Sequence, residues 1–236
     1  ASFFVPLMQF NTNVLEAARV NKVEKIVYTS SIGAYQPYDI FYEKDAYVGE
    51  PMDVYPGWAK RMAEYQLETY AIQYGFHNFA ILRPCNVYGP GDNFDITNAM
   101  VIPTLMAKID RGDDPVMVWG NGSAVRDIAF SRDVAEGILS AATRDTFGLG
   151  PINLGSGKGY TIKEVVETLH QFLEFNYEFD PTKPDGYPIR VMDITLAKQH
   201  LGYDPKTSLL DGLKETWAWY QTNKNINSQR HNYFKD

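Results

Sequence analysis

The sequence predicts an α/β protein in which a doubly wound, mostly parallel sheet carries helices on its faces. Short β-branched runs alternate with helical patterns along the chain, which is typical of parallel βαβ units. Small polar residues or glycines follow several of these runs, as they do where strands end in loops. With 44% hydrophobic and 22% charged residues, the 236-residue chain has a globular composition and room for one large or two small domains.

The elements of the first half follow from hydrophobic periodicity. Apolar side chains recur at helical spacing from Leu7 on, and Pro6 suits a first helical turn. A longer helical pattern ends at Gly75, a residue that often terminates helices. We therefore predict strands at 25–31, 78–84 and 115–120, and helices at 7–20, 57–74 and 98–111.

The second half contains stronger boundary signals. A short extended piece from Asp127 leads into a helix that begins near Ser131, and a strand at 150–157 ends in glycines. Thr161 opens the pattern Thr-x-x-Glu, a capping box that predicts the start of a helix. We expect helices at 162–174, 193–201 and 208–222, with a hinge rich in Pro and Gly at 180–188.

Charge and cysteine content exclude several classes of function. A net charge of −7 argues against a nucleic-acid surface, which needs a basic face. No apolar run approaches the roughly 18–20 residues that a membrane span requires. The one cysteine, Cys85, excludes an internal disulfide and favours a cytoplasmic location; we interpret it as a buried, inert thiol. No metal-ligand spacing of the C-x-x-C or H-x-x-x-H type occurs.

Four stretches qualify as parts of a ligand site. In open α/β sheets the ligand lies beyond the carboxyl ends of the strands. The stretches that follow predicted strands are TSSIGAY (29–35), RPCNVYGPGDNF (83–94), WGNGSAVRD (119–127) and NLGSGKG (153–159). The glycine-rich 155–159 segment is not a Walker loop, because G-x-x-x-x-G-K-[ST] is absent.

These stretches, in this order, resemble the extended short-chain dehydrogenase/reductase superfamily, the NAD-dependent epimerases and dehydratases of nucleotide sugars. TSSIGAY is similar to the segment with the active-site Ser or Thr, and GWAKRMAE (57–64) to the helix with the catalytic lysine. The segment 182–220 is most similar to the C-terminal lobe of the GDP-L-fucose synthases. The resemblance covers about residues 7–222.

The resemblance implies a Rossmann-like doubly wound sheet with a small C-terminal α/β substrate lobe. We expect residues 1–160 to form a partial Rossmann-type domain, in which 78–115 supply loops to the substrate site, and residues 161–236 to form mainly the lobe. Members of the superfamily begin with a G-x-x-G-x-x-G turn that binds the pyrophosphate of NAD(P). Nothing in the sequence matches that turn, so we expect the N-terminal strands to be missing.

The resemblance also implies roles for individual residues. Ser31, Tyr55 and Lys60 would be catalytic, and Ser30 with Lys60 would contact NAD or NADP. The ligands of a nucleotide-diphosphate sugar would be Asn86, Arg126 and Arg190, with Lys183 as a weaker candidate. Helices 7–20 and 57–74 would form a homodimer. The ordinary alternatives are a serine that ends a strand, a solvated lysine and a surface ion pair between Arg126 and Asp127.

One departure concerns the catalytic tyrosine. In the superfamily it precedes the lysine by four residues, and Pro56 occupies that position here. Tyr55 is one residue further away, about 100° around a regular helix. A proline in the first turn would place Tyr55 just outside the helix. A phenol with a pKa of about 10 becomes a useful base only beside a cation such as Lys60. Tyr55 is thus either the acid/base or an ordinary tyrosine at a helix entry.

A second departure concerns the fucose synthases. They carry a histidine acid just before V-I-P, where this chain has Met100, which has no proton to give. The main hypothesis is therefore an NAD(P)-dependent nucleotide-sugar epimerase, dehydratase or reductase. The alternatives are a non-catalytic or truncated sugar-nucleotide-binding remnant that no longer binds a dinucleotide, and a truncated product that merely folds.

Overall fold

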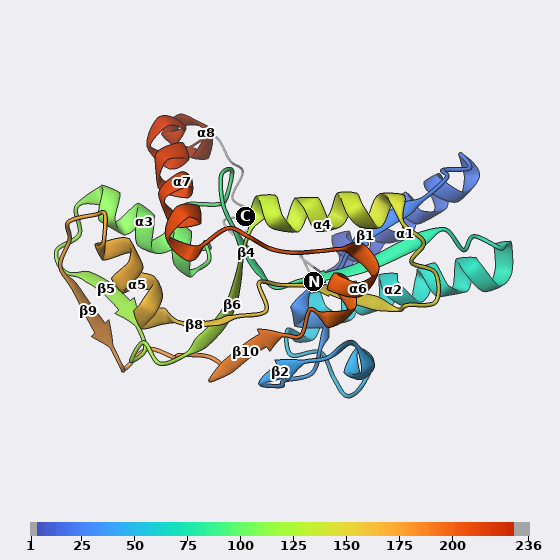
Figure 1. Ribbon diagram of the computed structural model, residues 1–236, viewed down its shortest axis with the longest axis horizontal. Coiled ribbons are helices and arrows are strands. Elements are labelled where there is room, and N and C mark those ends of the chain that lie inside the picture. Colours follow the sequence, from blue (N-terminus) through green and yellow to red (C-terminus); the bar gives the residue numbers. More distant parts are fainter. Residues whose placement is uncertain (1–3, 229–236) are drawn as a thin grey trace.

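A computed structural model describes residues 4–228 (Figure 1). The helices are α1 (Phe4–Val20), α2 (Val54–Tyr74), α3 (Val101–Arg111), α4 (Ser131–Thr143), α5 (Ile162–His170), α6 (Thr195–Leu201), α7 (Leu209–Thr222) and α8 (Lys224–Ser228). The strands are β1 (Ile26–Thr29), β2 (Ile40–Phe41), β3 (Phe79–Pro84), β4 (Asn86–Tyr88), β5 (Val116–Trp119), β6 (Val125–Phe130), β7 (Pro151–Leu154), β8 (Gly159–Thr161), β9 (Tyr177–Asp180) and β10 (Ile189–Met192). Two 3₁₀ turns are η1 (Ile32–Ala34) and η2 (Glu43–Asp45).

The pairing of the strands confirms the predicted α/β class. The strands β1, β3 and β7 form a parallel sheet in that order, with Thr29 opposite Leu82. A second set, β2-β10-β6-β4, is also parallel and carries β8 antiparallel to β6. The strands β5 and β9 form a separate parallel pair. The carboxyl ends of β1 and β3 therefore lie side by side, which is where the ligand rule places a site.

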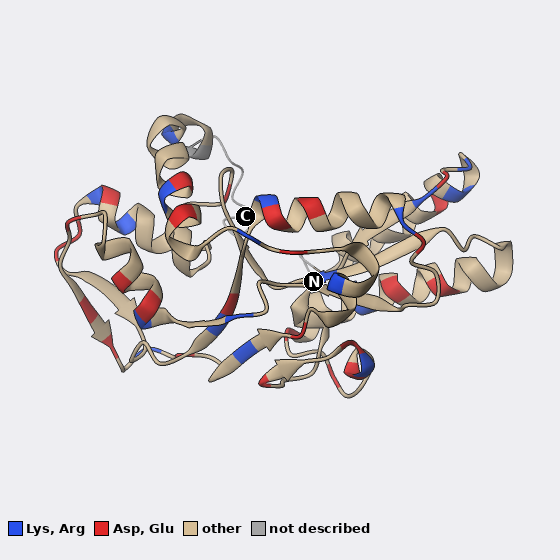
Figure 2. Ribbon diagram, in the orientation of Figure 1, with Lys and Arg blue, Asp and Glu red and all other residues tan. Residues whose placement is uncertain are grey.

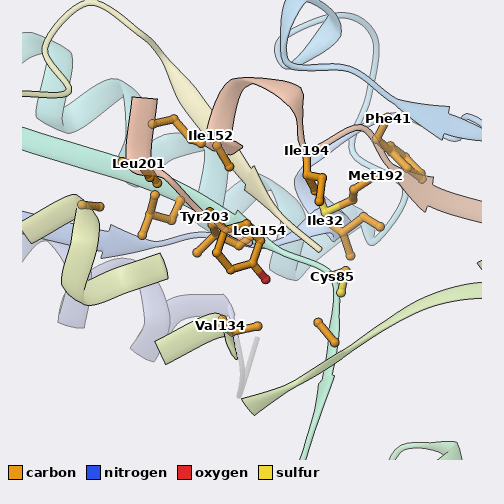
Figure 3. Close-up of a cluster of buried hydrophobic side chains, with 14 of the residues drawn as sticks. Ile32, Phe41, Cys85, Val134, Ile152, Leu154, Met192, Ile194, Leu201 and Tyr203 are labelled. Atoms are coloured by element: carbon orange, nitrogen blue, oxygen red, sulfur yellow. The ribbon is translucent and has the colours of Figure 1, made fainter. Parts of the chain in front are cut away.

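Side chains of β3 alternate between two apolar layers. Phe79 and Ile81 pack with Leu15 of α1 and Leu67 of α2 on one face of the sheet. Ala80 and Leu82 belong to the cluster on the other face, together with side chains from α4, β7 and α6. Figure 3 shows this second cluster, with Cys85 at its edge. A strand buried on both faces reads as the continuous apolar run that the sequence has here.

In Figure 1 the helices and strands gather at two ends of the molecule. The helices α1, α2, α4 and α6 surround β1, β3 and β7 at one end, and α3, α5 and α7 accompany β5 and β9 at the other. A separate apolar cluster fills the second end and includes Leu105, Val118, Val165 and Leu213. The domain boundary at residue 160 stays a prediction.

Helix α2 begins earlier than predicted. Its first residue is Val54, three positions before the predicted start, so Tyr55 lies inside the first turn and not just outside it. The amide of Gly57 donates to the carbonyl of Asp53 at 2.6 Å, which extends the helix toward its N-terminus. Pro56 is compatible with this turn because the first helical amides have no partner to lose.

Other helix boundaries follow the sequence signals. The predicted capping box is confirmed, because the Thr161 side chain accepts from the Glu164 amide and the Glu164 carboxylate accepts from the Thr161 amide. Helix α5 ends at His170, before the predicted 174, and α3 starts at Val101, after the predicted 98.

A buried ion pair fastens α2 to the sheet. The Arg83 guanidinium donates from Nε and Nη2 to the two carboxylate oxygens of Glu64, at 2.9 and 2.6 Å, and both side chains are 0% exposed. The third Arg83 contact is the carbonyl of Ala46 at 2.9 Å. The Cζ atom of Arg83 lies 4.3 Å from the centre of the Tyr35 ring and 5.5 Å from the centre of the Tyr47 ring. One cation thus joins β3, α2 and the 43–49 segment.

Charges elsewhere are mixed. Lys and Arg alternate with Asp and Glu over both ends of the molecule in Figure 2, so the described surface has no wholly basic end. None of the helices in residues 4–228 is long and apolar enough to cross a membrane.

The buried pair generates a stability prediction. We expect Arg83→Met to lower the free energy of unfolding by about 3–5 kcal/mol, because Glu64 would remain buried without a partner. Urea denaturation measures this change. Removing both charges, in Arg83→Met with Glu64→Leu, should recover most of it. The control is Arg111→Met, which breaks an exposed pair with Asp113 and should leave the stability almost unchanged. A loss below 1 kcal/mol for Arg83→Met would contradict the assignment.

Candidate active site

Ser31 occupies the N-cap of η1, directly after β1. Its Oγ accepts a hydrogen bond from the Gly33 amide at 3.0 Å, so its hydroxyl proton remains available for a ligand. The neighbouring Ser30 is buried, and its Oγ has no hydrogen-bond partner within the described structure. Buried hydroxyls normally find a partner, so Ser30 marks a position where a ligand atom would be accommodated.

Two glycines bring η1 and α2 into direct contact. A Cβ on Gly57 would lie 2.4 Å from the backbone oxygen of Gly33, and a Cβ on Gly33 would lie 2.2 Å from the Asp53 carboxylate. Backbone atoms cannot move aside as a flexible side chain can. The first turn of α2 therefore approaches the backbone of the Ser31 turn because position 57 lacks a side chain, while a side chain at position 33 would displace the Asp53 carboxylate.

Lys60 reaches the carboxyl end of β1. Its Nζ donates to the carbonyl of Thr29 at 2.8 Å and lies 5.2 Å from the centre of the Tyr28 ring. Burial lowers the pKa of the Lys60 ammonium, while the charge of Glu64 one turn further along α2 opposes that shift. The structure thus places Lys60 and Ser31 at the end of the same strand.

Tyr55 does not join Ser31 and Lys60 in the corner that these two residues form at the end of β1. Its side chain is 71% exposed, and no hydrogen bond joins it to Lys60 in the described part of the chain. Pro56, four residues before Lys60, is also exposed. The acid/base role of Tyr55 stays a prediction.

The glycine-rich 155–159 segment has an internal function. The carboxylate of Asp127 accepts from the backbone amides of Ser156 and Gly157, at 2.7 and 3.2 Å, and from the amide of Met192 at 3.1 Å. These amides are therefore occupied by a buried side chain and are not a phosphate cradle. Cys85 lies beside this carboxylate, and burial raises the pKa of its thiol. This supports the interpretation of Cys85 as an inert core residue.

A cavity of about 630 Å³ opens next to Asn86. Its walls come from α3, β5, the start of β6 and the 184–185 segment, and the side chains include Met100, Leu105, Met117, Trp119, Arg126 and Asp185. Along β5, Val116 and Val118 are buried, whereas Met117 and Trp119 are exposed. Trp119 opens the predicted ligand stretch 119–127, whereas Asp185 lies in the predicted hinge at 180–188, where no sequence signal pointed to the site. The volume is that of a pocket for a drug-sized ligand.

Arg126 and Arg190 are neighbours on parallel strands. They stand opposite each other in the register of β6 and β10. Burial, and then the charge of Arg190, lower the pKa of Arg126. Arg126 donates to the carbonyls of Tyr187 at 2.6 Å and Asp185 at 2.9 Å, which ties the 185–187 segment to β6. Arg190 stacks over the Tyr187 ring at 4.6 Å, and its buried Nε has no partner among the described residues.

Two like charges across a strand pair destabilise a sheet unless an anion lies between them. The predicted ligands Arg126 and Arg190 thus lie together: Arg126 lines the cavity, and Arg190 stands opposite it on β10. Asn86 also lines the cavity, and its side-chain amide donates to the carbonyl of Asp127 at 3.2 Å. Lys183 is exposed and is not among the cavity-lining residues. No group of His, Cys, Asp and Glu in residues 4–228 is arranged to hold a metal ion.

Known proteins match over most of the chain. GDP-L-fucose synthase 1 of Arabidopsis thaliana is 34% identical over 94% of this chain and 71% of its own length. GDP-L-fucose synthase of Escherichia coli K12 is 30% identical over 95% of this chain and 75% of its own length.

Solved structures share the fold. A GDP-L-fucose synthetase from Naegleria fowleri bound to NADP superposes with a TM-score of 0.85 at 25% identity, covering 95% of this chain and 74% of that one. The UDP-glucose 4-epimerase of Thermotoga maritima, solved with UDP-glucose, has a TM-score of 0.76 at 28% identity, covering 91% and 69%. The model of the NAD dependent epimerase/dehydratase family matches residues 3–155. With this match over more than half of its length and a relative 34% identical to it, the chain belongs to the NAD-dependent epimerase/dehydratase family.

Proposed function

We propose that this chain carries out nicotinamide-dependent epimerase or reductase chemistry on a nucleotide-diphosphate sugar. The observation that carries the proposal is the position of Ser31 and Lys60 at the end of β1, in a molecule whose cavity is lined by Asn86 and by Arg126, with Arg190 opposite Arg126 on β10. The names of the relatives support the same class, since they include GDP-L-fucose synthases and a GDP-heptose reductase from C. jejuni.

The residues present fit the nicotinamide end of NAD or NADP. Ser30 has a buried hydroxyl with no hydrogen-bond partner among the described residues, and the ammonium of Lys60 lies at the end of β1, where a ribose hydroxyl could be bound. The glycine-rich segment after β7 does not fit the pyrophosphate, because Asp127 occupies its amides. When bound, the nicotinamide supplies or accepts a hydride at a sugar carbon.

The catalytic roles divide between the two sides of this corner. Ser31 donates its hydroxyl proton to the sugar oxygen and so polarises the carbonyl or orients the alcohol. Lys60 holds the ribose and adds positive potential. Tyr55 would exchange the proton with the sugar oxygen after turning from its exposed position toward Lys60. The lysine charge would then lower the pKa of the phenol.

The cavity side would hold the nucleotide. Arg190, with its free Nε, and Arg126 supply a double fork for the diphosphate, which would relieve the repulsion between them. Asn86, which lines the cavity, would contact the sugar. The GDP-sugar enzymes among the relatives support guanosine as the nucleoside. The alternative, a remnant that binds sugar nucleotides without catalysis, has no support from the relatives named here.

The first prediction tests the substrate class. Isothermal titration with GDP- and UDP-hexoses, and separately with NAD⁺ and NADP⁺, should show binding of at least one nucleotide sugar. Arg190→Gln should weaken that binding by about 10-fold or more, because a charge-assisted hydrogen bond is lost. Arg132→Gln, a change at an exposed arginine paired with Glu215, should leave the affinity unchanged. Failure to bind any nucleotide sugar, or equal affinity in Arg190→Gln, would overturn the proposal.

The second prediction concerns the Lys60 ammonium. Its NMR titration should give a pKa below the usual value of about 10.4, and Glu64→Gln should lower it further by removing a nearby negative charge. The unfolded chain would bind this proton more tightly than the folded chain. Stability should therefore rise as the pH increases from the folded pKa toward about 10.4, and Lys60→Met should abolish that rise. An unshifted titration would contradict the burial of Lys60.

The third prediction concerns a homodimer through α1 and α2. Phe10 is 62% exposed on α1 and Ile72 is 86% exposed on α2, which supports an apolar contact between two copies. Light scattering should give a dimer mass for the parent chain and a monomer mass for Ile72→Glu. The matched control is Leu139→Glu on α4, where an apolar side chain is 67% exposed but lies on another face of the sheet. A monomer mass for the parent chain would refute the dimer.

A further inference from the structure

Within residues 4–228, Arg61 is a buried cation without an acidic partner of its own. Its side chain is 2% exposed, and its hydrogen bonds go to backbone carbonyls. Nε donates to the Ala34 oxygen at 3.1 Å, Nη2 donates to the same oxygen, and Nη1 donates to the Gly49 oxygen at 2.6 Å. The nearest buried carboxylate, Glu64, is already held by both arms of Arg83.

The burial of this guanidinium is unfavourable for the folded state. Burial and the neighbouring charge of Arg83 both lower the pKa of Arg61. A buried guanidinium that lacks a paired anion disfavours the folded state, and an apolar side chain of the same size would often serve stability better. The guanidinium of Arg61 nevertheless does what an apolar side chain cannot do: two of its N–H groups donate to the same carbonyl oxygen.

The carbonyl that Arg61 holds belongs to the last residue of the turn that presents Ser31. Ala34 is the last residue of η1, and Ser31 is the N-cap of the same turn. The residue before Arg61 on α2 is Lys60, which donates to Thr29 two positions before Ser31. Segment 29–34 is therefore bound by α2 at both ends, and Ser31 lies between the two bonds. The close contact of Gly33 with Gly57 leaves no space for the turn to shift toward the helix.

We propose that Arg61 is a positioning residue that holds the Ser31 hydroxyl in register with Lys60 by fixing the Ala34 carbonyl. The inference rests on the proposed function, because it assigns Ser31 to the reacting sugar oxygen. It adds that the orientation of Ser31 is set from α2 and not only from β1.

The test compares Arg61→Met with Arg61→Lys, which keeps the charge and one donor direction but loses the fork. Amide hydrogen exchange reports the turn directly, because the amides of Ala34 and Tyr35 close η1 through Ser31 and Ile32. In Arg61→Met, exchange at these two amides should rise at least 10-fold relative to exchange at Ile81 and Leu82 in β3. Arg61→Lys should give an intermediate rise.

The control is Arg83→Met, which removes an equally buried arginine that stacks on the Tyr35 ring but whose hydrogen bonds go to Glu64 and Ala46 and not to η1. It should raise exchange in β3 and η1 together. If Arg61→Met also raises exchange equally at both places, Arg61 acts only on global stability and the inference is overturned. This measurement needs no substrate, so it decides the role of Arg61 in fixing the turn even if no nucleotide sugar binds.

A kinetic readout connects the turn to the proposed chemistry. With a nucleotide sugar that turns over, Arg61→Met should lower kcat at least 10-fold and change KM for the sugar nucleotide by less than about twofold. Arg61→Lys should recover part of kcat. Unchanged kcat beside a loosened turn would show that the orientation of Ser31 does not matter for the reaction. Absence of turnover in the parent chain would count against the proposed function alone.

Discussion

The buried pair of Arg83 and Glu64 is the interaction on which the arrangement of this molecule depends. Both groups are removed from water, so each would be strongly unfavourable without the other. Their two parallel hydrogen bonds fix the axial position and the rotation of α2 over β3. Once Glu64 is fixed, Lys60 lies one turn earlier on the same helix face and falls over the end of β1. The position of the lysine is thus a consequence of the ion pair.

The turn that carries Ser31 is adjusted to the same helix from the other side. Gly33 and Gly57 allow backbone to approach backbone, and Arg61 adds a fork to the Ala34 carbonyl. The cations on this stretch of α2 therefore have different partners: Lys60 faces the strand end and Arg61 faces the turn. Because α2 supplies both contacts, a shift of the helix would move both sides of the corner together. Such a site keeps its geometry as long as the helix stays seated.

Sequence patterns predicted the parts that depend on local chemistry. The capping box at Thr161 and the apolar run of β3 are encoded within a few residues, and both were found. The strands β2, β4, β8, β9 and β10 have only two to four residues each, which is too short for a periodic pattern to predict them. Tyr55 was expected just outside the helix, but the bond from Gly57 to Asp53 extends α2 beyond it. Ser31, Lys60, Arg126 and Arg190 were selected by resemblance. Their neighbours across the fold, such as Asp185 beside Arg126, depend on pairing of distant segments and could not be read from spacing.

A crystal structure of the chain with a bound nucleotide sugar would test the central claim most directly, namely that the Ser31–Lys60 corner and the arginine-lined cavity form one site. The account predicts the diphosphate between Arg126 and Arg190, and the hexose extended past Asn86 to within hydrogen-bond distance of the Ser31 Oγ. A nucleotide bound away from the two arginines, or a hexose that points into solvent and away from β1, would contradict it.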